Sequence, residues 1–222
     1  MVALHAEIPG IVLYEPERVR QAIEAHAPKP MSKDEEEDED EKFWRAQFQS
    51  PIRDPHIIVG FLALFPVEKT GAGPCWGATE VKLAAAHQGY GPMLYDVAMA
   101  IAPNHTLISD RGSVSISAQR IWDFYLNQRS DVEKLKLDDK NNPQTPPTED
   151  DCELHNVYRP SLNYAYKGRG QQPTALEATH EKFMKELIQL AKKRGLDLTP
   201  ESAENDIYWS GRMFFSNKYR GD

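Results

Sequence analysis

The feature that most constrains this chain is an uninterrupted apolar run, Ile57 to Phe65, which is rich in β-branched and aromatic residues. Successive side chains of a strand point to opposite faces, so a run without polar alternation predicts a strand that is covered on both sides. A turn follows at 68–74, and a second strand is predicted at Trp76 to Ala86. The two strands predict a hairpin at the centre of a sheet.

Helical periodicity appears after this hairpin. Gly89-Tyr90-Gly91-Pro92 interrupts the strand pattern and opens a helix that Pro103 ends. A short strand at 106–109 and a second helix, from about Ser115 to Gln128, follow. This order predicts an α/β fold with a mixed, mostly antiparallel sheet, helices on both faces and a C-terminal helical extension.

The two ends of the chain also carry local signals. Glu15-Pro16-Glu17 favours a helix start after a short strand at Ile11–Leu13. The capping box Thr174–Glu177 opens a helix that is expected to end at Gly195. The aromatic tail, Ile207 to Tyr219, is expected to be held against the rest of the protein.

Charge patterning limits the possible partners. Asp34–Glu41 is a run of eight acidic residues, and such a block repels itself, which predicts a solvated loop at 31–42. An arm that binds a basic partner is the alternative. The formal net charge of −8 argues against a broad nucleic-acid-binding face. The predicted organisation is a core at 1–128, a polar, proline-rich excursion at 129–173, and a C-terminal helix and tail at 174–222 packed on the core.

The cysteines and the N-terminus bear on the compartment. Cys75 and Cys152 are far apart and form no CxxC pair, so two reduced thiols in a cytoplasmic protein are expected. The start of the chain lacks the pattern of a secretory signal, and no apolar run approaches the ~20 residues needed to span a membrane. The histidines show no HExxH spacing, so no metal site is expected.

A family resemblance covers residues 56–126. The order of hairpin, Gly-x-Gly turn, helix, strand and helix, together with Ser115, Ala118 and Trp122 on the last helix, resembles the GNAT superfamily of N-acetyltransferases, including GNAT-like proteins of bacteriophages. Two positions depart from the family pattern. Ala86 stands where arginine or glutamine usually begins the loop, and Trp122 stands where a tyrosine often protonates the leaving thiolate.

The resemblance implies acetyl-CoA as the co-substrate. Glu80–Ala86 would be a strand that splays from its neighbour, and the loop after it would supply backbone N–H groups to the CoA pyrophosphate, beside a helix N-terminus. The residues implied in binding acetyl-CoA are Leu83, Ala85, His87, Gln88, Gly89, Tyr90, Gly91 and Ser115.

Aminolysis of a thioester suggests the catalytic candidates. The amine must lose a proton and the departing sulfur must be neutralised. Glu80 is the predicted base, with His87 as the alternative, and a solvent-facing strand residue is the competing interpretation of Glu80. Tyr125, one helical turn beyond Trp122, is the predicted acid.

Three functions are consistent with these features. The first is an acyl-CoA-dependent N-acyltransferase that acetylates a primary amine on a small molecule, a protein or a modified nucleobase. The second is a catalytically inactive GNAT-fold binding protein, consistent with Ala86 and Trp122. The third is a structural or inhibitory interaction protein, acting in the host cytoplasm if it is phage-encoded, with the acidic loop and the 129–172 segment as its docking surface.

Overall fold

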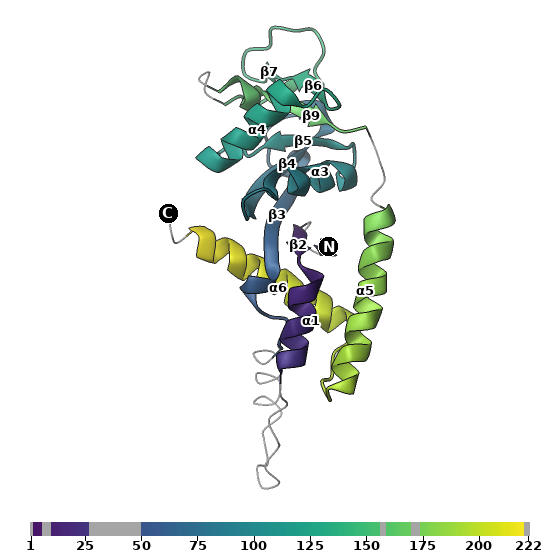
Figure 1. The fold of residues 1–222 in the computed structure, drawn as a ribbon. Helices are drawn as coiled ribbons and strands as arrows, with labels where there is room; N and C mark the ends of the chain where they lie inside the picture. The colour runs from purple at the N-terminus through teal and green to yellow at the C-terminus, as the bar shows by residue number, and fades with distance from the viewer. Residues whose placement is uncertain (1, 6–9, 27–49, 156–158, 170–173, 220–222) are drawn as a thin grey trace, which may run out of the picture. The chain divides into compact units, whose positions relative to one another are not determined.

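The computed structural model describes residues 2–5, 10–26, 50–155, 159–169 and 174–219 (Figure 1). The predicted acidic loop at 31–42 lies outside these residues. The chain forms two compact units. The first contains Met1–His5, Val12–Val59 and Ala175–Asp222, and the second contains Ala6–Ile11 and Gly60–Thr174.

The N-terminal part of the first unit follows the local signals. α1 (Pro16–Ala25) comes directly after β2 (Gly10–Tyr14), as predicted. Pro16 lies in the first turn, where the missing N–H costs nothing because that group has no partner within a helix. Val19 and Ile23 form its buried face. The unit also includes β1 (Val2–His5) and the 3₁₀ turn η1 (Pro55–Ile57).

Two long helices complete the first unit. α5 (Thr174–Lys193) matches its prediction, and Gly195 follows it in the left-handed region, with a φ of +73°. α6 (Pro200–Tyr219) begins before the predicted tail, because Thr199 caps it by accepting a bond from Ser202 N at 3.1 Å. Ser210 Oγ donates to Ile52 O at 2.9 Å, so the expectation that the tail is held is confirmed.

The second unit is organised around strands in the order β3-β4-β5-β9-β6 (Figure 1). β3 (Ile58–Pro66) and β4 (Thr79–Ala86) form the predicted antiparallel hairpin. β4 pairs in parallel with β5 (Thr106–Ser109), whereas β5–β9 and β9–β6 are antiparallel. The predicted α/β class, with a mixed and mostly antiparallel sheet, is confirmed.

Two helices of the second unit also match their predictions. They are α3 (Gly91–Ile101) and α4 (Ile116–Gln128). Trp122 of α4 meets Tyr95 of α3 edge-on, with ring centroids 5.1 Å apart, and stacks on Tyr166 of β9 at 5.2 Å. This buried aromatic cluster joins both helices to one face of the sheet.

The segment at 129–173 differs from the predicted loop. It contributes β6 (Glu133–Lys136) and β9 (Tyr164–Lys167) to the sheet, and a small parallel pair, β7 (Asp138–Asp139) with β8 (Asp151–Cys152). β6 carries mostly charged side chains, as edge strands often do. Because of this composition, the sequence pattern did not predict a strand here. Three 3₁₀ turns also belong to the unit: η2 (Val67–Lys69), η3 (Cys75–Gly77) and η4 (Pro160–Asn163).

The cysteines correct a second expectation. Cys75 and Cys152 form a disulfide across a sequence separation of 77, so the prediction of two reduced thiols was wrong. Both are fully buried, in an apolar cluster with Ile108, Leu137 and Ala165. The pairing depends on β8 lying against the turn that precedes β4, and no local sequence signal reports that contact.

Candidate functional site

The site begins where β4 leaves β5. The parallel pairing joins Thr79 with Leu107, Glu80 with Ile108, and Val81 with Ser109. β5 then ends, while β4 continues beside β3 to Ala86. The register with β3 shifts at this point, which leaves Lys82 as the extra residue of a β-bulge. A bulge bends its strand and increases the local twist, so it turns β4 away from β5.

Burial changes at the same position. Glu80 and Val81 are buried, whereas Leu83 is 41% exposed and Ala85 is half-buried. Beyond Val81, β4 pairs with no described residue on the β5 side, so that edge of its backbone is open to another partner. Leu83 and Ala85, two of the predicted cofactor-binding residues, lie on this open stretch.

The loop from His87 to Gly91 connects the open end of β4 to α3. Tyr90 N donates to His87 O at 3.1 Å and closes a tight turn, in which Gly89 has a φ of +91°. Only glycine adopts that conformation without strain. The side chain of Tyr90, the N-cap residue, does not cap α3, so that side chain leaves the positive end of the helix dipole uncovered.

Gly91 has a packing role in addition to any binding role. A Cβ atom placed on it would lie 2.9 Å from Ile121 Cδ1, so α3 and α4 approach closely here. The structure therefore brings the predicted loop residues, including the exposed Gln88, next to the open strand. It also places the N-terminal half of α4 against the start of α3.

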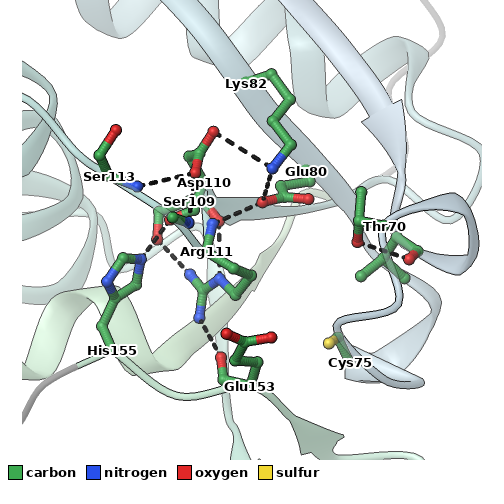
Figure 2. Close-up of polar contacts among 12 residues, drawn as sticks. Thr70, Cys75, Glu80, Lys82, Ser109, Asp110, Arg111, Ser113, Glu153 and His155 are labelled. Carbon is green, nitrogen blue, oxygen red and sulfur yellow. Dashed lines mark hydrogen bonds and ion pairs between the residues drawn. The ribbon is translucent and has the colours of Figure 1, made fainter.

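Glu80 lies on β4 within a cluster of polar side chains (Figure 2). Its side chain is fully buried, so the competing interpretation of a solvent-facing strand residue was wrong. Oε1 accepts hydrogen bonds from Lys82 Nζ at 2.7 Å and from Arg111 N at 2.6 Å. Oε2 has no hydrogen-bond partner among the described residues.

Arg111 is the central cation of the cluster. Its guanidinium donates to Ser109 O at 2.9 Å, to Leu162 O at 2.8 Å and to Ser109 Oγ, and more weakly to Glu153 O at 3.3 Å. Burial lowers the pKa of Arg111 to about 10, which leaves it charged at neutral pH. These bonds hold Arg111 between the end of β5 and the carbonyl groups of Glu153 and Leu162.

Lys82 and His155 complete the cluster from two sides (Figure 2). Burial disfavours the charge of Lys82, but bonds to Glu80 and to Asp110, 3.4 Å away, outweigh it and raise its pKa. His155 Nε2 donates to the Asp110 carbonyl, and burial, aided by the charge of Arg111, lowers the pKa of His155. His155 is therefore neutral at pH 7.

The chemistry available here follows from these contacts. One oxygen of the Glu80 side chain forms an ion pair with Lys82. The other oxygen accepts no hydrogen bond from the described residues. Glu80 lies near the start of β4, opposite Ile108 close to the carboxyl end of β5. Such a group can take a proton from a bound amine or from water.

The predicted acid does not lie beside the predicted base. The Tyr125 hydroxyl is 2.5 Å from Asp96 Oδ1 and 3.1 Å from Pro92 O, and Asp96 also binds Arg129 at 2.8 Å. Burial, reinforced by Asp96, raises the pKa of Tyr125.

The register of the sheet explains this separation. Glu80 pairs with Ile108, whereas Tyr125 packs against Tyr166, which pairs with Leu107. Neighbouring residues of β5 point to opposite faces, so Glu80 and Tyr125 lie on opposite faces of the sheet.

Ser115 has a defined structural role. It is the N-cap of α4, and its hydroxyl accepts a bond from Ala118 N at 3.3 Å. The prediction that this segment caps a helix is confirmed. Trp122, further along α4, is 1% exposed and fills the aromatic cluster.

The sequence did not point to the partners of Glu80. Lys82, Asp110, Arg111 and His155 were not singled out as site residues. The available signal was the charged pair Asp110-Arg111 directly after a buried strand, at the end where parallel strands place ligand-binding residues. His155 carried no signal, because it reaches the site through the fold of the 129–173 segment.

A cavity of about 520 Å³ lies at the other end of these strands. It is lined by His105 and by residues 130–133 and 167–169. Asp131 in its wall is held by Arg129, whose hydrogen bond lowers the pKa of Asp131 to about 2. The predicted site residues all lie outside this lining.

The described residues contain no candidate membrane-spanning helix and no candidate metal site. None of the helices there combines the length and apolar character that crossing a membrane requires. No group of three or more His, Cys, Asp or Glu side chains in those ranges is placed to hold a metal ion. Comparisons with protein-family models, curated proteins and solved structures found no match to this chain.

Proposed function

We propose that this protein binds acyl-CoA at the carboxyl ends of β4 and β5 and transfers the acyl group to a primary amine. The observation that carries the proposal is the end of the parallel pairing of β4 with β5 at a bulge, followed by a Gly-x-Gly loop and by a helix that the side chain of its N-cap residue Tyr90 does not cap. This is the arrangement that the resemblance to the GNAT superfamily implies.

Each part of the cofactor has a proposed position. The pantetheine arm lies along the open edge of β4, where backbone N–H groups near Leu83 and Ala85 polarise the thioester carbonyl. The pyrophosphate lies on the loop formed by residues 87–91, where glycine permits a close approach and the helix N-terminus favours an anion. Acetyl-CoA is the proposed co-substrate.

The proposed reaction uses the open oxygen of Glu80. The amine nitrogen attacks the thioester carbon, a C–N bond forms, and the C–S bond to CoA breaks. Glu80 Oε2 takes the proton that the amine loses, directly or through a water molecule. The CoA thiolate is protonated by Tyr125 if a shift of α4 frees its hydroxyl, and otherwise by solvent.

For the acceptor, the proposal names a chemical class and not one molecule, and the compartment follows from the co-substrate. The acceptor is a primary amine of a small molecule, a protein or a modified nucleobase. Because acyl-CoA is a cofactor of the cell interior, the proposal assigns the protein to the cytoplasm, of the host if the chain is phage-encoded.

The first test is acetyl-CoA binding by calorimetry with a matched pair of glycine variants. Gly89 and Gly195 both have a positive φ, and a Cβ added to either would meet no described atom within 4 Å. Gly89→Ala and Gly195→Ala therefore introduce the same kind of backbone strain, of roughly 1–2 kcal/mol. Gly89→Ala should weaken acetyl-CoA binding by about tenfold or more, which corresponds to ~1.4 kcal/mol.

Gly195→Ala should leave the affinity unchanged, because Gly195 lies in the other unit. If the unmodified protein does not bind acetyl-CoA, the proposal is wrong. Equal losses in both variants would show that general destabilisation, and not the loop, reduces binding.

The side chains between α3 and α4 favour a second candidate function, binding without catalysis. The Tyr125 hydroxyl already bonds Asp96, and Trp122 occupies the position where the family often has its acid. Both observations suit a protein that binds acyl-CoA without transferring the acyl group. Release of free CoA thiol in the presence of a panel of primary amines separates the two functions, since a binding protein releases none.

A further inference from the structure

The disulfide lies one residue away from the part of the chain that completes the Glu80 cluster. Cys152 is followed by Glu153, whose carbonyl accepts from Arg111, and then by His155, which donates to Asp110 O. Cys75 lies in the turn that leads into β4. A single covalent bond therefore connects the strand that carries Glu80 with the segment that closes the cluster.

Hydrogen bonds around the disulfide place residues 149–155 flat against this turn. Trp76 N donates to Glu149 O at 2.5 Å, and Glu153 N donates to Ala72 O at 2.7 Å. The approach is close, because a Cβ on Gly73 would lie only 2.6 Å from Asp151 O. The disulfide lies between these two backbone bonds, so its loss removes the covalent link at the centre of the contact and leaves hydrogen bonds, including Lys140 N to Cys152 O at 3.1 Å, to hold the segment.

Arg111 and His155 are not held equally. Arg111 retains its bonds to Ser109 and Leu162, and its own N–H remains bonded to Glu80. His155 depends on Asp110 O and on a reciprocal pair with Asn163, in which His155 N donates to Oδ1 at 2.7 Å and Asn163 Nδ2 donates to His155 O at 3.0 Å. Freeing the segment should therefore release His155 and Glu153 first and leave Arg111 in place.

We propose that the Cys75–Cys152 bond is a redox switch that sets the position of His155 and Glu153 over the Glu80–Arg111 cluster. Oxidised protein has the closed cluster of Figure 2, and reduced protein has a mobile 149–155 segment. The coupling between the disulfide and the 149–155 segment is argued from the contacts alone. A role of this coupling in controlling catalysis rests on the proposed function. A disulfide in the compartment of acyl-CoA is more often redox-sensing than structural.

The chemistry is thiol–disulfide exchange with a dithiol. One thiolate of the dithiol attacks a sulfur of the Cys75–Cys152 bond, which forms a mixed disulfide and releases the other cysteine as a thiolate that takes a proton. The second thiol of the reductant then displaces the remaining cysteine, and the reductant leaves as a disulfide. Both sulfurs are fully buried, so exchange needs the 149–155 segment to open.

The test is amide hydrogen exchange by NMR in oxidised protein, in protein reduced with dithiothreitol, and in the Cys75→Ala/Cys152→Ala variant. The reporters are the N–H groups of Glu153 and His155, and the internal control is the N–H of Arg111. On reduction, exchange at the two reporters should speed up by about tenfold or more beyond any change at Arg111, which reports the stability of the whole unit, and the variant should show the same difference.

Three outcomes would overturn the proposal. The first is unchanged protection of Glu153 and His155 after reduction. The second is an equal loss of protection at Arg111, which would mean that the bond stabilises the whole unit and not this segment in particular. The third is absence of the disulfide from protein purified without reductant. Acetyl-CoA titration of the oxidised protein tests the proposed function separately. Failure to bind acetyl-CoA would remove the proposed function and leave the measured coupling intact.

Discussion

Glu80 is a fully buried carboxylate residue of β4, and its contacts explain how the fold accepts it. Removing a carboxylate from water costs several kcal/mol unless it is paired and hydrogen-bonded. Lys82 and Arg111 N supply that pairing on one oxygen. The other oxygen is left without a described partner, which costs about 1–3 kcal/mol and is tolerated most often where the group has a chemical task.

Glu80→Gln tests that task. Glutamine keeps an acceptor for Arg111 N but cannot take a proton from an amine, so turnover should fall by ~10²–10⁴-fold with acetyl-CoA affinity nearly unchanged. Lys82→Met removes the paired cation and serves as the control, because it should alter stability more than turnover. Normal turnover in Glu80→Gln would contradict the assignment of Glu80 as the base.

His180 gives a prediction for the first unit. Its Nδ1 is hydrogen-bonded to the Tyr14 hydroxyl, 2.9 Å away, and its Nε2 is 3.7 Å from Glu204. Burial lowers the pKa of His180 from 6.5, although Glu204 opposes the shift. The unfolded chain therefore binds this proton at higher pH than the folded chain, and stability is lost as the pH falls from the unfolded pKa to the folded pKa.

The urea midpoint of unfolding should thus decrease as the pH falls below the unfolded histidine pKa of about 6.5. His180→Gln should flatten part of this dependence, with the remainder due to His155, whose pKa is also lowered. His56 is exposed, so His56→Gln is a control that should leave the slope unchanged. A slope that is identical in wild type and His180→Gln would exclude His180 as its source.

Among the structural elements, the turn before β4 and the 149–155 segment form one packed contact. Gly73 has a φ of +122° and lies against the backbone carbonyl of Asp151, which cannot swing aside as a side chain can. Gly71, two residues earlier, has a φ of +72°, and a Cβ there would meet no described atom within 4 Å. Both positions therefore strain the backbone of any other residue, and Gly73 adds a steric overlap that Gly71 lacks.

Gly71→Ala should cost only the left-handed strain, roughly 1–2 kcal/mol. Gly73→Ala should cost about 1–3 kcal/mol more, because the new methyl group must displace the backbone of β8. The free energy of unfolding from urea titration measures both. Equal costs would mean that the segment is not packed against the turn as described.

For the molecule as a whole, the disulfide closes a long loop within the second unit. A bond across 77 positions restricts the unfolded chain and stabilises the folded unit by about 4 kcal/mol in the loop-entropy estimate. Cys75→Ala/Cys152→Ala should lower the free energy of unfolding by up to that amount, and reduced wild type should behave like the variant. No difference between oxidised and reduced wild type would contradict the estimate.

Long-range pairing also explains which expectations failed. The 129–173 segment carries prolines, charges and short strands, so its composition predicted a loop, although β6 and β9 complete the sheet. The reduced-thiol expectation failed because the contact that pairs Cys75 with Cys152 spans 77 positions. Both failures concern pairing between distant segments, which hydrophobic periodicity does not report.

Local sequence was sufficient to predict the elements and their order: the apolar hairpin, the Gly-x-Gly turn, and the helices that open at Pro16, Pro92, Ser115 and Thr174. These follow from neighbouring residues, because periodicity, capping and turn conformation act within a few positions. The folded structure was needed to show that Glu80 is buried beside Arg111, that Tyr125 lies on the opposite face, and that His155 joins the cluster through its bond to Asp110. Strand register and long-range pairing set those placements, and they depend on the burial and hydrogen bonding of the complete fold.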